Sequence, residues 1–88
     1  MFSIVREKGA MRMTKEELTK YVKQVIKMEM LKKDINFVEL QKMMEEKGYN
    51  YSLDAIRQKV GRGTYDARFL FEFADSLGLD IKFIEKEN

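Results

Sequence analysis

The chain has 88 residues and a formal net charge of +2, and it contains no cysteine, histidine, proline or tryptophan. This length suits one small domain, and the missing cysteine and histidine remove disulfides, thiolate metal sites, the usual general base and the commonest metal ligand, so we expect no enzyme, no metal and no cofactor. The sequence contains neither an apolar run of the roughly 20 residues that span a membrane nor a secretory leader, so we expect a cytoplasmic protein without membrane contact.

Residues 1–13 predict an N-terminal arm or a short strand, because apolar and polar residues alternate over 2–6. Thr14, with Glu17 three residues later, is typical of a capping box and predicts a first helix over about 15–32. The apolar stripe of this helix follows spacings of three and four residues: Leu18, Tyr21, Val22, Val25 and Ile26, joined by Glu29.

Asn36 and Glu39 form a second capping signature, which predicts a helix over about 37–47 that stops at Gly48. Its expected inner face consists of Val38 or Phe37, then Leu40, Met43 and Met44.

Ser52 is expected to cap a third helix over about 53–61, and the tripeptide 61–63 is expected to break it. Its inward-pointing residues are Leu53, Ile56 and Val60.

Either Thr64 or Asp66 is expected to cap a fourth helix over about 67–77, with Phe71 exposed. Its apolar stripe consists of Leu70, Phe73, Ala74 and Leu77. After Gly78, a period-two alternation over 79–83 predicts a strand.

This order of caps and turns resembles the four-helix core of λ-repressor-like (Cro/C1-type) helix-turn-helix DNA-binding domains over about residues 15–78. The residues that carry the resemblance are Ile35 to Leu40, Gly48, Ser52 to Ile56, Arg62, Gly63 and Phe73 to Leu79. The resemblance implies a mainly α fold in which 14–78 form the helix-turn-helix domain, 1–13 an arm or strand, and 79–88 a C-terminal strand and tail.

Two features depart from that family. Gln41 stands where the family usually has a small residue, and the distance from Leu40 to Gly48 is longer than usual. The second helix is therefore expected to be longer, or the turn wider. The stretch Lys59 to Tyr65 also resembles a signature of a small group of uncharacterised bacterial domains.

The outer side of the third helix suits a DNA major groove. At about 100° per residue, Gln58 lies opposite the inward residues, with Ala55 beside it and Arg62 at the end. Glutamine can pair with adenine, alanine can touch a thymine methyl, and arginine or lysine can bind phosphates. The candidate DNA-binding residues are Asn36, Tyr51, Asp54, Ala55, Arg57, Gln58, Lys59 and Arg62. The competing interpretation is an ordinary surface helix with solvated charges.

The charges run from basic to acidic along the chain. Residues 1–33 carry nine Lys/Arg against four Asp/Glu, whereas 64–88 carry three against six. We therefore expect a small DNA-binding transcriptional regulator of bacterial or phage type that reads double-stranded DNA with helix 53–61. The terminal strands are expected to form a homodimer or to close the edge of the domain. The alternative is a protein-interaction module, antitoxin-like or an assembly partner, with the same fold.

Overall fold

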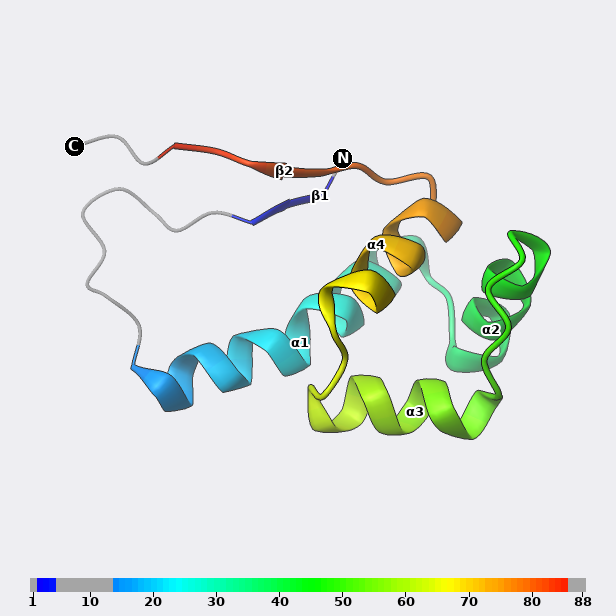
Figure 1. Cartoon of the computed structure of the whole chain (residues 1–88), viewed down its shortest axis with the longest axis horizontal. Helices are drawn as coiled ribbons and strands as arrows, with labels where there is room; N and C mark the ends of the chain where they lie inside the picture. Colours follow the sequence, from blue (N-terminus) through cyan, green and yellow to red (C-terminus); the bar gives the residue numbers. More distant parts are fainter. Residues whose placement is uncertain (1, 5–13, 86–88) are drawn as a thin grey trace.

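The computed structural model describes residues 2–4 and 14–85 of the chain. The fold is mainly α, with four helices between two short strands, as the sequence predicts (Figure 1). The elements are β1 (Phe2–Ile4), α1 (Lys15–Lys33), α2 (Phe37–Glu46), α3 (Leu53–Arg62), α4 (Ala67–Ser76) and β2 (Ile81–Phe83). Within these ranges, no helix is both long enough and apolar enough to cross a membrane.

Each helix begins at a predicted cap. Thr14 and Asn36 both complete a capping box, in which the cap side chain accepts from an N3 amide and the N3 glutamate accepts from the cap amide. Ser52 accepts from the Ala55 amide at the start of α3. Of the two residues considered for α4, Asp66 is the cap, since its carboxylate accepts from the amide of Phe69 at 2.9 Å.

The four helices also end in one way, with a left-handed residue just after the last turn. These residues are Asp34, Gly48, Gly63 and Gly78. The amide of Gly63 donates to the carbonyl of Val60 and that of Thr64 to the carbonyl of Lys59. The tripeptide 61–63 ends the helix as predicted, but at its last residue, so α3 runs one residue beyond the expected end at 61. Gly61 and Arg62 continue α3, because the left-handed backbone is adopted at 63 alone.

Other boundaries shift by one or two residues. α2 ends at Glu46 and α4 at Ser76, since Lys47 and Leu77 are their C-caps. β2 begins at 81 rather than 79. The predicted N-terminal strand over 2–6 is observed over 2–4, and its last two residues lie outside the described part of the chain.

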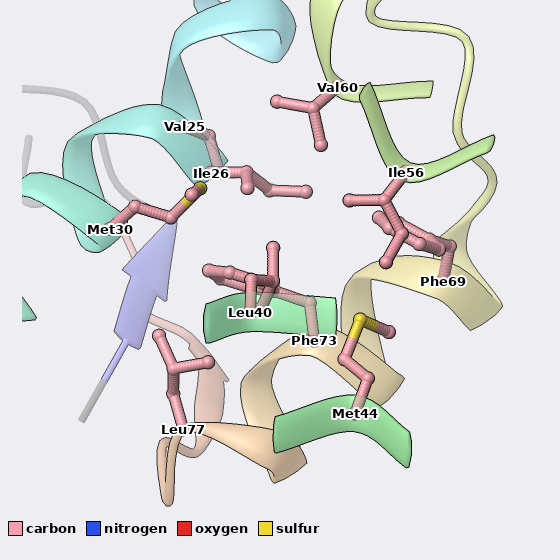
Figure 2. Packing of buried hydrophobic residues seen from close by; sticks show 10 residues of the cluster. All are labelled: Val25, Ile26, Met30, Leu40, Met44, Ile56, Val60, Phe69, Phe73 and Leu77. Carbon is pink, nitrogen blue, oxygen red and sulfur yellow. The ribbon is translucent and has the colours of Figure 1, made fainter. Parts of the chain in front are cut away.

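All four helices contribute to one hydrophobic core (Figure 2). The core consists of Val25, Ile26, Met30, Leu40, Met44, Ile56, Val60, Phe69, Phe73 and Leu77. Leu18 was expected inside but is 52% exposed, because the N-terminal turns of α1 extend past the other helices (Figure 1). Val38 is also exposed, and Phe37 packs against the core in its place.

The two ends of the chain meet in a parallel pair of strands. Phe2 of β1 is opposite Ile81 of β2, and Ile4 is opposite Phe83. This pair lies on the side of the molecule away from α3 (Figure 1). The strands therefore leave the outer side of α3 open.

Candidate nucleic-acid interface

Helix α3 is held in the core on one side and is uncovered on the other. Ile56 and Val60 have no exposed surface, and α3 packs against α1 and α2. On the opposite side, where Figure 1 shows no other element below α3, five residues are exposed: Asp54, Arg57, Gln58, Gly61 and Arg62. We call these residues the outer face of α3.

The polar side chains of the outer face have no partners among the residues that the structure describes. Among the described residues, Arg57, Gln58 and Arg62 make no hydrogen bond or ion pair. Asp54 is the single carboxylate of this face and lies in the first turn, where negative charge favours the helix dipole. The outer face therefore presents two guanidinium groups and an amide that can bind an external ligand.

Lys59, a predicted phosphate contact, is turned toward α4. Its ammonium lies 5.7 Å from the centre of the Tyr51 ring and 5.8 Å from the centre of the Phe69 ring. Such cation–π contacts hold the side chain at the edge of α3 rather than on its outer face. Ala55 is half-buried at the same edge.

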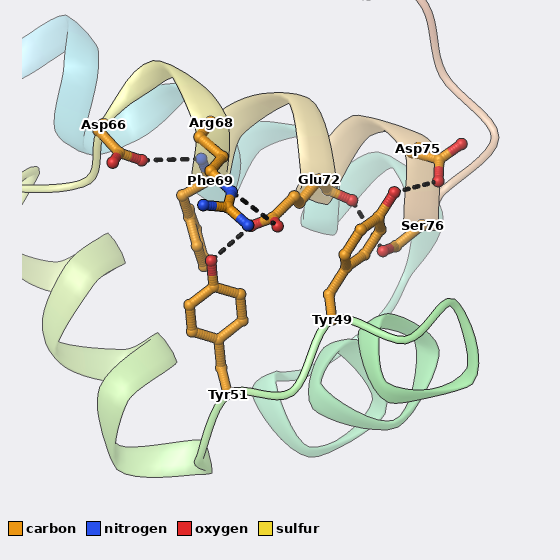
Figure 3. Close-up of polar contacts among 8 residues, drawn as sticks. All are labelled: Tyr49, Tyr51, Asp66, Arg68, Phe69, Glu72, Asp75 and Ser76. Carbon is orange, nitrogen blue, oxygen red and sulfur yellow. Dashed lines mark hydrogen bonds and ion pairs between the residues drawn. The ribbon is translucent and has the colours of Figure 1, made fainter.

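Tyr51, a predicted DNA contact, packs inside the loop that joins α2 to α3 (Figure 3). Its ring meets that of Phe69 edge to face at 5.2 Å between centroids. Its hydroxyl donates to the carboxylate of Glu72, and this hydrogen bond raises the pKa of Tyr51. We therefore assign Tyr51 to the packing of the loop, because both its ring and its hydroxyl already have partners.

Two further contacts fix this loop on its neighbours. The hydroxyl of Tyr49 donates to Asp75 at 2.7 Å, and this bond raises the pKa of Tyr49 (Figure 3). The side-chain amide of Gln41 donates to the backbone carbonyl of Tyr51 at 3.4 Å. Gln41, the residue that departs from the resembled family, thus joins α2 to the loop. The loop over 47–52 is tied to both α2 and α4, which sets the direction in which α3 leaves it.

Asn36 is engaged in the cap of α2. Its side-chain oxygen accepts from the backbone amide of Glu39 at 2.8 Å, and its backbone amide donates to the Glu39 carboxylate at 3.1 Å. It is exposed, but no described hydrogen bond joins it to α3.

Sequence reasoning missed two residues of this region, Lys23 and Gly61. A Cβ placed on Gly63 would lie 2.7 Å from Cγ of Lys23, so Lys23 of α1 packs against the C-terminal end of α3. No sequence signal links positions 23 and 63, because their proximity depends on how α1 and α3 cross. The sequence places Gly61 in the tripeptide that ends the helix but does not predict that it forms part of the outer face.

A second surface feature is an apolar cleft of about 260 Å³ between α1 and the start of α4. It is lined by Leu18, Tyr21, Val22, Val25, Tyr65, Asp66, Ala67 and Leu70.

In the described ranges, no group of three or more carboxylates, histidines or cysteines could hold a metal ion.

A protein-family model described as "Domain of unknown function (DUF6471)" matches residues 10–81. No curated protein and no solved structure matches the chain significantly.

Proposed function

The chain belongs to the DUF6471 family of domains of unknown function, and we propose that it is a small DNA-binding regulator that reads duplex DNA with the outer face of α3. One observation carries the proposal. Arg57, Gln58 and Arg62 are exposed and have no partners in residues 2–4 and 14–85, on a helix whose other side is fixed in the core. Because the core holds the backbone of α3, binding has to order these side chains but not the helix that carries them.

The proposed roles follow from the position of each residue. Gln58 lies opposite the buried side of α3, where a side chain reaches furthest into a major groove of about 12 Å width. Arg57 and Arg62 lie to its two sides and would bind the phosphates that border the groove. We assign a third phosphate contact to Lys23, whose Cγ packs against Gly63 at the end of α3.

The order of the elements supports a helix-turn-helix role for α2 and α3. The two helices are consecutive, pack on each other, and are joined by a loop that Tyr49 and Tyr51 anchor. A helix-turn-helix unit needs such a fixed angle, because one helix lies across the DNA backbone while the other enters the groove. The resemblance to λ-repressor-like domains implies this arrangement. We further propose that the protein binds DNA in the cytoplasm.

Salt dependence of binding to a labelled random-sequence duplex tests the proposal. Each phosphate neutralised should contribute about −0.9 to the slope of log K against log salt, so contacts from Arg57, Arg62 and Lys23 predict about −2.7 per protomer. The variant Arg57→Ala/Arg62→Ala should bind more weakly and lose about two thirds of this slope. Lys82→Ala removes an exposed lysine from β2, away from α3, and serves as the control. A flat plot for the folded parent protein would overturn the proposal.

A protein-interaction module is the second candidate, and the surface between α1 and α4 favours it. The apolar cleft of about 260 Å³ lies there, and Phe71 of α4 is 50% exposed. Exposed apolar surface of this kind marks a binding site for another protein. Folded protein that binds no duplex even at low salt would favour this candidate.

A further inference from the structure

We infer that Gly61 is the point at which a phosphodiester strand of the bound duplex comes closest to α3. The inference rests on the proposed DNA-binding function and identifies a positioning residue within it. Gly61 is exposed, lies in the last turn of α3, and a Cβ built on it meets nothing within 4 Å.

No feature of the described fold requires glycine at this position. The φ of Gly61 is not positive, and no neighbour would collide with a side chain at this position. Gly63, two residues later, differs in both respects, since its φ is 65° and Cγ of Lys23 lies 2.7 Å from the position of a Cβ. Glycine is the least favourable helix residue after proline. Gly61 therefore weakens α3, and no contact within the described fold compensates for this loss.

The position of Gly61 on α3 indicates that a bound ligand needs the space a side chain would fill. At about 100° per residue, Gly61 lies in line with Asp54 and between Arg57 and Gln58 on the outer face. A ligand that these side chains hold would meet the helix backbone at Gly61. Gly61 lies on the Arg57 side of Gln58, and Arg57 would bind phosphate in the proposed docking, so we assign the approaching group to the sugar–phosphate strand that borders the groove on that side.

Gly61→Ala tests this inference through two measurements with opposite expected signs. The melting temperature should rise by a few degrees, because alanine is the better helix residue. The affinity for duplex DNA should fall about tenfold, a loss equivalent to about 1.4 kcal/mol, because the new methyl group keeps the strand from the backbone. Gly61→Leu, also a good helix former, should weaken binding further without lowering the melting temperature.

Gln24→Ala is the matched control, since Gln24 is exposed on α1, and it should leave DNA affinity unchanged. A Gly61→Ala protein that melts higher and binds as the parent does would overturn the inference, as would one that melts lower, because glycine would then serve the fold. Failure of the parent protein to bind any duplex is a different result and overturns the proposed function itself.

Discussion

Individual side chains around α3 divide into those that hold the helix and those that remain free. Tyr51 and Lys59 are in the first group, because Glu72 and the Phe69 ring engage them. Arg57 and Gln58 are in the second group, exposed and without partners among the described residues. The division separates substitutions that should alter stability from those that should alter binding alone.

Gln58→Ala and Arg62→Ala should impair DNA binding in different ways. Gln58 faces base edges in the proposed docking, so its loss should cost about 1–3 kcal/mol on the preferred site and little on random DNA. Arg62 would bind phosphate, so its loss should weaken binding to all sequences and reduce the salt slope by about one. Competition titrations with specific and random duplexes measure both effects. Full discrimination by the Gln58→Ala protein, with loss of discrimination in Arg62→Ala, would mean that α3 docks in another orientation.

Tyr51→Phe should lower the free energy of unfolding by about 1 kcal/mol near pH 8, because it removes the hydrogen bond to Glu72. The raised pKa of Tyr51 means that the folded state holds this proton more tightly than the unfolded state. Its stabilising effect is therefore complete below the ordinary pKa of 10.0 and is lost as pH rises through the higher pKa of the folded state. Urea unfolding from pH 8 to 11 should show a smaller alkaline decline in the variant.

Tyr21→Phe provides the control for that measurement, since the Tyr21 hydroxyl has no hydrogen bond within the described residues. Parallel alkaline profiles for the parent and the Tyr51→Phe protein would mean that the Glu72 contact does not stabilise the fold.

At the scale of elements, the helix ends show one local weakness. α2, α3 and α4 each place glycine at the left-handed position after the helix, whereas α1 places Asp34 there with φ 54°. A residue with a Cβ is strained in this conformation. The carboxylate also lies at the negative end of the α1 dipole, which disfavours it further.

Asp34→Gly should therefore stabilise the protein by about 0.5–1 kcal/mol, because glycine adopts the left-handed conformation without a steric penalty. For a domain of this size, that gain raises the melting temperature by about 2–8 °C, measurable by calorimetry. Asp34→Asn removes the charge and keeps a side chain, so it should recover only part of the increase. An unchanged or lower melting temperature in Asp34→Gly would show that the end of α1 carries no strain.

For the whole molecule, the strand pair is the part of the fold with the least packing around it. A two-stranded sheet is marginal by itself, and in β2 and just beyond it Phe83 is 79% and Ile84 51% exposed. We propose that a second copy of the chain covers these strands, which is one of the two roles expected from the sequence; the other is to close the edge of the domain.

Deleting 79–88 should lower the melting temperature and reduce the mass in light scattering to that of one chain. Phe83→Asp changes only an exposed side chain, so it should dissociate the proposed dimer with little loss of stability. If the parent protein and both variants all have the mass of one chain, the strands close the domain edge and do not dimerise it.

Much of the helical framework follows from local signals. The capping boxes at Thr14 and Asn36 predict where α1 and α2 begin, and the spacing of Ile56 and Val60 predicts the buried side of α3. Local signals place the end of α3 within 61–63 but not at a single residue, because glycine can either end a helix or continue it. The choice at 61 depends on whether the left-handed residue is Gly61 or Gly63.

The sequence by itself determined the mainly α class, the four helix starts and most of the core, because capping and helical periodicity join residues a few positions apart along a backbone of known geometry. Only the tertiary structure decided that Tyr51 bonds to Glu72, that Lys23 packs against Gly63, and that the two ends of the chain pair in parallel. These contacts join residues far apart in the chain. They depend on the angles at which whole helices pack, which are set by the shape of the complete core rather than by any local pattern.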